Sequence, residues 1–203
     1  MIDSRCTQAW LRALRLSAAC WLTVSLGACG GGGSNPLDNP PSVNNATLTA
    51  GQKLAFAYFQ QCIHPILVAQ TCSASGCHDS VNGTGGALRL IPSAAQIDLS
   101  SAANTPEAIR NSDMYKNFYS AQGSSAIGSP AQSKLLNKPL VLGVLHGGGL
   151  IFQNAQDPNV KRIEYWIARP AAQNQDEFSA STYSMFTPQF DPANASASTC
   201  NTQ

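Results

Sequence analysis

Few charged residues, and no catalytic signature built from serines or acids, are the first features of this sequence. Only 11% of its 203 residues are Asp, Glu, Lys or Arg, and the formal net charge is +1. No basic excess therefore steers the chain to nucleic acid. No serine lies in a Gly-x-Ser-x-Gly elbow, and the scattered acids form no paired-carboxylate site. The run Gly83–Gly86 lacks the Lys and Ser/Thr of a phosphate loop. Nothing in the sequence argues for an enzyme.

The N-terminal region contains an apolar stretch, Leu16–Leu26, that is too short to span a bilayer as a permanent helix. Three arginines precede it, and Leu-Gly-Ala-Cys29 follows it. This order is typical of an export signal and resembles a bacterial lipobox, in which the cysteine is lipidated. We therefore expect residues 1–28 to be removed and Cys29 to carry a lipid. An ordinary signal peptide cut after Ala28 is the alternative. No Asp follows Cys29, which favours sorting to the outer membrane in a Gram-negative cell.

The exported chain is expected to form a single domain behind a flexible linker. Residues 29–48 are rich in Gly, Pro and Asn and are assigned to the linker. Residues 49–203 then form the domain, with a core at about 60–170 and a polar C-terminal wrap at 171–203. Removing the signal leaves 9 basic and 10 acidic residues, a formal net charge of −1.

The sequence also has no long run in which apolar and polar residues alternate, as they do in β-strands. Its apolar spacing predicts a small, mainly α domain with long irregular loops. Residues 49–64 carry apolar side chains at steps of three and four, and we expect Pro65 to end that helix. Thr105-Pro106-Glu107 has the signals of a helix start. A last helix is predicted over 158–168, with most of its apolar residues on one broad face.

The motif Cys72-Ser-Ala-Ser-Gly-Cys77-His78 carries the chemistry. In an exported protein, two cysteines followed at once by a histidine suit covalent attachment of haem. Each thiol would add to one vinyl group, and the His78 imidazole would reach the iron from the proximal side. The spacing of four residues between the cysteines is rarer than the common spacing of two.

The opposite axial position has several candidates. His146 lies in a glycine-rich loop after the apolar run Leu140–Leu145, and glycines allow a backbone to approach a large flat ligand. We expect His146 to be the distal ligand, or else a hydrogen-bonded residue beside the haem edge. Met114 and Met185 are thioether alternatives and would give a higher potential than two histidines. His64 is interpreted as a packing residue or a propionate contact.

Two other readings of the motif remain open. Cys72 and Cys77 would form a local disulfide, or they would join His78 and His146 in a tetrahedral zinc site. The leftover thiols Cys62 and Cys200 are expected to pair in an oxidising compartment, fastening the C-terminal tail to the first helix.

Several ordered blocks together resemble the cytochrome c-like domains of planctomycete and proteobacterial envelope proteins. The resemblance covers about residues 60–170. It rests on the following blocks: the motif at 72–78, Gly85-Gly-Ala-Leu-Arg-Leu90, Ser133-Lys-Leu-Leu-Asn-Lys-Pro139, His146-Gly-Gly-Gly149 and Tyr165-Trp-Ile167. It implies a small helical cytochrome c-like fold with one haem c, His78 as proximal ligand and His146 at the distal position.

The sequence thus predicts a monohaem c-type cytochrome that is lipid-anchored in the cell envelope and passes single electrons to a partner protein. The alternative is a haem-free binding or structural lipoprotein in which Cys72 and Cys77 are a disulfide or a metal site. Haem sensing or peroxidase-like chemistry is a third reading and needs an open iron position. Lys134 and Lys138 are interpreted as solvated charges near a helix end.

Overall fold

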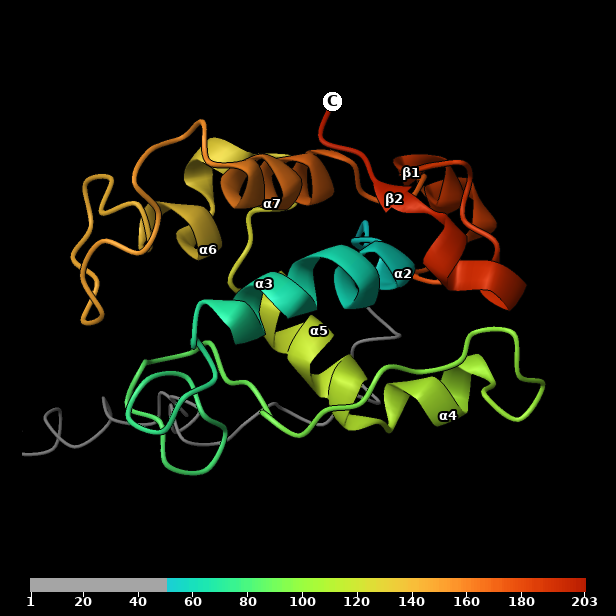
Figure 1. The fold of residues 1–203 in the computed structure, drawn as a ribbon, viewed down its shortest axis with the longest axis horizontal. Coiled ribbons are helices and arrows are strands. Elements are labelled where there is room, and N and C mark those ends of the chain that lie inside the picture. Colours follow the sequence, from blue (N-terminus) through green and yellow to red (C-terminus); the bar gives the residue numbers. More distant parts are fainter. Residues whose placement is uncertain (1–50) are drawn as a thin grey trace, which may run out of the picture. The chain divides into compact units, whose positions relative to one another are not determined.

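A computed structural model describes residues 51–203. The predicted signal segment 1–28, the lipid site Cys29, the whole linker 29–48 and the first two residues of the predicted domain lie outside the described residues. The described chain is rich in helix, with two short strands (Figure 1), as the mainly α prediction required. The elements outside the tail are the following: α2 (Phe56–Tyr58), η2 (Phe59–Ile63), α3 (His64–Ala69), α4 (Pro106–Arg110), α5 (Asp113–Gly123), η3 (Pro130–Gln132), α6 (Lys134–Asn137) and α7 (Pro158–Ala168).

The first helical stretch differs from the prediction at both ends. It begins at Phe56 and runs through α2, η2 and α3 to Ala69, so Pro65 lies inside it and does not end it. A proline cannot donate to the preceding turn, and its ring crowds the carbonyl before it. The π-helical turn η2 immediately before α3 widens the helix at this point, and Pro65 then occupies the first turn of α3.

The predicted last helix matches α7 over Pro158–Ala168, and Asp157 caps it by accepting a hydrogen bond from Asn159 N at 2.7 Å. Trp166 of α7 is fully buried and donates from Nε1 to the Ala55 carbonyl at 3.0 Å. Its ring also lies 5.5 Å from that of Phe59. The apolar faces of the first and last helical stretches therefore pack on each other.

α4 and α5 cover another side of this core. Thr105 caps α4 by accepting from Ala108 N at 3.2 Å, so the predicted helix start is confirmed. Phe118 of α5 is fully buried and packs edge-on against the ring of Phe59, 5.6 Å away between centroids. Aromatic contacts of this kind add packing energy beyond simple burial.

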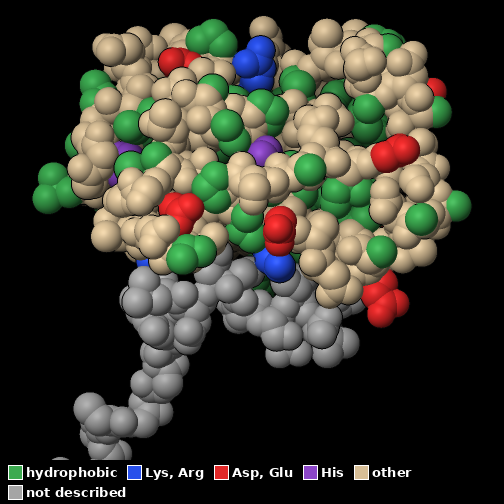
Figure 2. Space-filling view, turned by 60° about the horizontal axis from the view of Figure 1, so that its bottom comes forward, with side chains coloured by type: hydrophobic (Ala, Val, Ile, Leu, Met, Phe, Trp, Pro, Cys, Tyr) green, Lys and Arg blue, Asp and Glu red, His purple; other side chains and the backbone are tan. Residues whose placement is uncertain are grey.

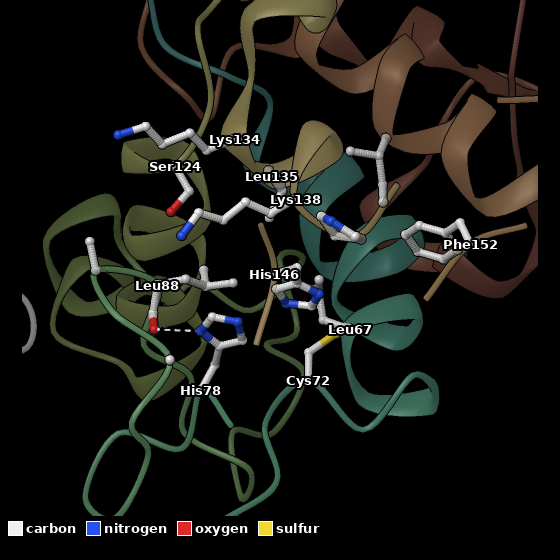
Figure 3. A pocket seen from close by; sticks show the side chains of 14 residues that line it. Leu67, Cys72, His78, Leu88, Ser124, Lys134, Leu135, Lys138, His146 and Phe152 are labelled. Atoms are coloured by element: carbon white, nitrogen blue, oxygen red, sulfur yellow. Dashed lines mark hydrogen bonds between the residues drawn. The ribbon is translucent and has the colours of Figure 1, made fainter. Parts of the chain in front are cut away.

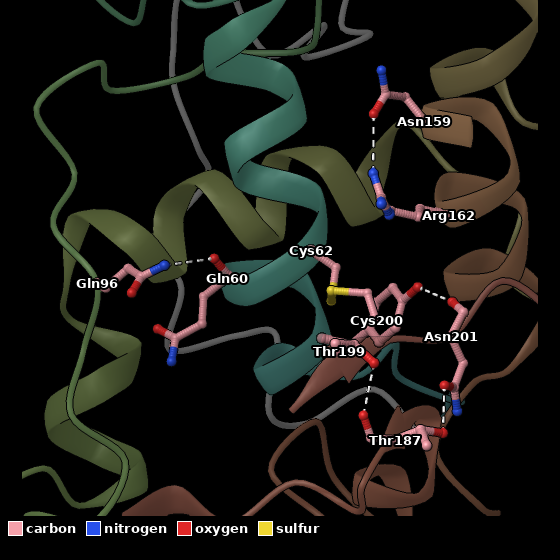
Figure 4. The surroundings of a disulfide bond; sticks show 10 residues. Gln60, Cys62, Gln96, Asn159, Arg162, Thr187, Thr199, Cys200 and Asn201 are labelled. Carbon is pink, nitrogen blue, oxygen red and sulfur yellow. Dashed lines mark hydrogen bonds between the residues drawn. A yellow bond between two sulfur atoms is a disulfide. The ribbon is translucent and has the colours of Figure 1, made fainter. Parts of the chain in front are cut away.

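The tail after α7 closes over the domain and contains η4 (Ala180–Met185), β1 (Phe186–Thr187), η5 (Pro192–Ala197) and β2 (Thr199–Cys200). The two strands pair antiparallel. The predicted disulfide is present: Cys62 is bonded to Cys200, with 6.0 Å between their Cα atoms (Figure 4). The tail is thus fastened to η2, as expected from the two leftover thiols.

A buried acid anchors the start of the tail. Glu177 is 2% exposed, accepts from Arg110 Nε at 2.8 Å and accepts from Tyr115 Oη at 2.6 Å. Burial alone would raise the pKa of Glu177, but the hydrogen bonds from Arg110 and Tyr115 stabilise the carboxylate and leave its pKa below the ordinary value.

Charged side chains are few and scattered on the face drawn in Figure 2, which agrees with the low charge content. Within residues 51–203, no helix combines the length and the apolar character that crossing a membrane requires.

Candidate functional site

A cavity lies between α3, α6, α7 and the two loops that carry His78 and His146 (Figure 3). It has about 850 Å³ of empty space, including its mouth. Most of the side chains that form it are apolar: Leu67, Ala87, Leu88, Leu135, Pro139, Phe152 and Ile163. Cys72, His78 and His146 also line it. Tertiary structure therefore brings the cysteine motif and the distant glycine loop to one place.

The motif 72–78 forms a compact turn. The His78 amide donates to the Cys72 carbonyl at 2.9 Å, and the Cys77 amide donates to the Ala74 carbonyl at 2.9 Å. Gly76 has φ of +83°, a conformation that favours glycine. The longer cysteine spacing is therefore accommodated by a hydrogen-bonded turn that ends directly at His78.

A short ladder and a glycine fix the His78 side chain. The Leu90 amide donates to the His78 carbonyl at 2.7 Å, which sets the neighbouring segment alongside the motif. His78 Nδ1 then lies 3.0 Å from the Leu88 carbonyl oxygen. A Cβ atom at Gly85 would lie only 2.5 Å from His78 Nδ1, so only glycine fits beside this ring. Because a carbonyl accepts only, Nδ1 carries the proton and Nε2 keeps a free lone pair.

Burial lowers the pKa of His78 below its ordinary value, and the charges of His146, Arg89 and Lys138 lower it further. The hydrogen bond to Leu88 acts in the opposite direction and does not outweigh them. His78 is therefore neutral at pH 7, the form in which an imidazole binds a metal.

His146 is held in the same manner by its own loop. Its Nδ1 lies 2.8 Å from the Gly149 carbonyl oxygen, and the Gly149 amide donates back to the His146 carbonyl at 2.9 Å. Gly149 has φ of +71°. Side-chain burial does not hold this loop in place, because Leu145 is 90% exposed. Backbone bonds such as Ile151 N to the Pro139 carbonyl, at 2.8 Å, close its base.

The two imidazoles face each other across the cavity. Their centroids are 6.2 Å apart, and their planes differ by 11°. Figure 3 shows the His78 edge opposite the Leu88 bond directed toward His146. One metal ion held between two imidazole nitrogens at about 2.0–2.1 Å each would place the ring centroids about 6 Å apart. The centroid spacing of the two parallel rings is therefore close to that of two imidazoles bound to one metal ion.

The two motif cysteines occupy different environments. Both are free thiols: Cys72 is half-buried and lines the cavity, whereas Cys77 is exposed. Burial raises the pKa of Cys72 to about 11, and the neighbouring Cys77 raises it as well. Cys72 is therefore a protonated thiol at neutral pH.

The two motif thiols are separate in the structure, and few acidic or metal-binding side chains lie near them. Cys72 and Cys77 are not bonded to each other. In the described part of the chain, no group of three or more His, Cys, Asp or Glu side chains converges on a possible metal position.

The methionine alternatives and His64 do not reach the cavity. Met114 is buried inside α5, and Met185 is buried in the tail at η4, and neither lines the site. His64 is also buried; its Nε2 lies 3.2 Å from Asn117 Nδ2, and its ring packs near Phe59. His64 is therefore a packing residue. Helix and tail packing turn both methionines into the core, away from this cavity.

Sequence analysis missed two residues of the site. Lys134 and Lys138, interpreted as solvated charges, both line the cavity. Their spacing of four residues was the available signal, because it predicts a shared helix face. That this helix face borders the cavity depends on the tertiary structure.

No protein-family model matches this sequence, and no curated protein or solved structure matches it either.

Proposed function

We propose that this protein is an exported monohaem c-type cytochrome, anchored by a lipid on Cys29 in the outer membrane, that carries single electrons between partner proteins. In this proposal the described residues form a cytochrome c-like domain. Cys72 and Cys77 hold the haem covalently, His78 is the proximal ligand and His146 is the distal ligand. The protein is a carrier and not an enzyme.

The paired arrangement of His78 and His146 is the observation that carries the proposal. Each ring has Nδ1 bound to a backbone carbonyl, at 3.0 Å and 2.8 Å respectively, and each therefore offers Nε2 as a ligand. Second-sphere bonds of this kind are typical of metal-binding histidines. Two protein ligands alone are too few for a structural zinc site, but they are the number that a macrocycle leaves open on its iron.

The surroundings also fit haem. The cavity wall is largely aliphatic and aromatic, which suits a flat apolar ring, and the Cys72 thiol lies at the same wall. When bound, haem would supply an iron that gains or loses one electron, with its potential set by the axial ligands and by burial. The chain's part is to fix both imidazoles and to limit water at the apolar walls.

Expression in a periplasm that contains the cytochrome c maturation machinery tests the proposal. The exported protein is expected to show a c-type α-band in a pyridine haemochrome spectrum and a mass increase of one haem. Replacing both motif thiols, Cys72→Ala with Cys77→Ala, should abolish the band and the added mass. Ser75→Ala, an exposed change inside the same turn, should retain both. Intact mass also reports whether Cys29 is lipidated.

A colourless protein with the apo mass, in a host that matures a control cytochrome, would refute the proposal. The haem-free lipoprotein would then be the better interpretation.

The distal assignment has a separate test. Reduced protein should be six-coordinate and slow to bind carbon monoxide, whereas His146→Ala should bind it rapidly. Met185→Leu is the matched control, because Met185 is buried away from the cavity and its replacement should leave the spectrum unchanged. Rapid carbon monoxide binding by the unaltered protein would instead favour a sensing or peroxidase-like role.

A further inference from the structure

The cavity has an unusual charge pattern for a mainly apolar site. Two lysines, Lys134 and Lys138, line it, and none of its lining residues is an acid. A ligand that brought no negative charge to this wall would leave both ammonium groups without a partner inside the site. The lining therefore favours a ligand that is apolar over most of its surface and anionic at one edge.

Two lysines elsewhere in the described chain, Lys116 and Lys161, have acidic partners. Lys116 contacts Asp113 at 2.8 Å, and Lys161 contacts Glu164 at 2.9 Å. Within residues 51–203, none of the ion pairs and none of the side-chain hydrogen bonds involves the ammonium group of Lys134 or Lys138. Both cavity lysines thus remain available to a bound anion.

The backbone places the two lysines on the same side of α6. Lys134 begins the helix, and Lys138 follows its last residue with helical torsions. The Lys138 amide donates to the Lys134 carbonyl at 3.2 Å, which is the i, i+4 bond of a helical turn. Residues four apart on a helix are neighbours on its surface. The two ammonium groups therefore act as a pair at one wall.

This pair lies away from the thiol end of the site. Figure 3 shows both ammonium groups on the opposite side of the imidazole pair from Cys72. Haem has the same asymmetry, because its vinyl groups lie along one edge of the porphyrin and its two propionate carboxylates lie along the opposite edge.

We infer that Lys134 and Lys138 bind the two propionate carboxylates of the haem. This inference rests on the proposed function and extends it to the carboxylate edge of the cofactor. The thiols and the lysines would then fix opposite edges of the same ring, so that only one rotational setting satisfies both. α6 would thereby be joined to the cofactor by charge as well as by the apolar contact of Leu135.

Carbodiimide cross-linking of the exported, haem-loaded protein tests this contact without measuring activity. The reagent joins a carboxylate to an amine that touches it, forming an amide while the carbodiimide takes up the water that is lost. The expected product is an amide between a haem propionate and Lys134 or Lys138, identified by peptide mass mapping. The Lys116–Asp113 ion pair provides an internal positive control, since its atoms are already 2.8 Å apart.

The variants and outcomes separate the inference from the proposed function. Lys134→Met with Lys138→Met should remove the haem amide completely and retain the Lys116–Asp113 amide. If the haem-loaded, unaltered protein gives the control amide but no haem amide, or joins haem to other lysines, the inference is wrong and the cytochrome proposal stands. If the matured protein contains no haem, the proposed function fails and the inference fails with it.

Discussion

Substituting alanine for Gly85 would test how tightly the fold fixes the His78 ring. A Cβ atom at this position would lie 2.5 Å from His78 Nδ1, 2.6 Å from His78 Cε1 and 2.6 Å from the Cys77 carbonyl oxygen. Real Cβ atoms essentially never approach other atoms closer than 3.0 Å. The Gly85 amide also donates to the Cys77 carbonyl at 2.6 Å, so the loop cannot move away without losing that bond. The imidazole must therefore move.

The expected cost follows from the number and type of these contacts. Overpacking a well-filled site costs about 1–3 kcal/mol, and we expect Gly85→Ala at the upper end because one contact is with backbone. A loss of about 3 kcal/mol corresponds to about a hundredfold shift in the equilibrium between the native and displaced arrangements of His78. Gly147→Ala is the matched control, because a Cβ atom there meets nothing within 4 Å.

Two assays should agree on this prediction. Haem content per protein, measured after expression with the maturation machinery, should fall sharply in Gly85→Ala and stay unchanged in Gly147→Ala. Urea unfolding should show a lower midpoint for Gly85→Ala only. If the two variants match in both haem content and midpoint, then Gly85 does not position His78 and the reasoning is wrong.

Three further predictions concern the scaffold. Glu177→Gln should lower the free energy of unfolding by about 2 kcal/mol at pH 7, because it removes charge-assisted hydrogen bonds. The folded-state pKa of Glu177 lies below its ordinary value of 4.5. The stability difference between the two proteins should therefore be complete above pH 4.5 and shrink as the pH falls through the folded-state pKa. Urea titrations from pH 7 to 3 measure it, and a difference that stays constant over this range would contradict the prediction. Replacing Cys62 and Cys200 with alanine opens a loop closed across 138 residues and should cost about 4–5 kcal/mol on the chain-entropy model, measured against the oxidised protein; an unchanged midpoint would count against a structural disulfide. Trp166→Phe removes the indole donor from the Ala55 carbonyl, which keeps its hydrogen bond from the Phe59 amide, and should cost about 0.5–1.5 kcal/mol by thermal unfolding; a loss of several kcal/mol would show that the indole does more than donate this bond.

Local signals determined the parts of the fold that depend on neighbouring residues. Asp157 and Pro158 marked the start of α7, and Thr105 marked the start of α4, because caps act within a single turn. The first helix was predicted less well. Pro65 was expected to end it, but whether a helix stops or continues past a proline depends on what packs around the next turn, and here a π-helical turn accommodates the ring.

The candidate site was predicted in part. The motif order singled out Cys72, His78 and His146, and the structure brings these three to one cavity. Met114 and Met185 were indistinguishable by sequence from possible ligands, because burial in another part of the core leaves no local mark. Lys134 is exposed, as expected of a solvated charge, but the sequence did not reveal that Lys134 and Lys138 would both line the cavity, because a charge near a helix end does not show which residues will pack beside it.

The sequence by itself determined the helix-rich class, the Cys72–His78 motif order, and the pairing of the two leftover cysteines, Cys62 and Cys200. These depend on residue type and short spacing, which act through nearby backbone bonds. Only the tertiary structure decided that His146, 68 positions after His78, would stand 6.2 Å from it with a parallel ring. That placement results from the packing of α3, α6 and α7 and from the ladder between His78 and Leu90. Contacts between residues far apart in the chain become defined only when the whole core forms.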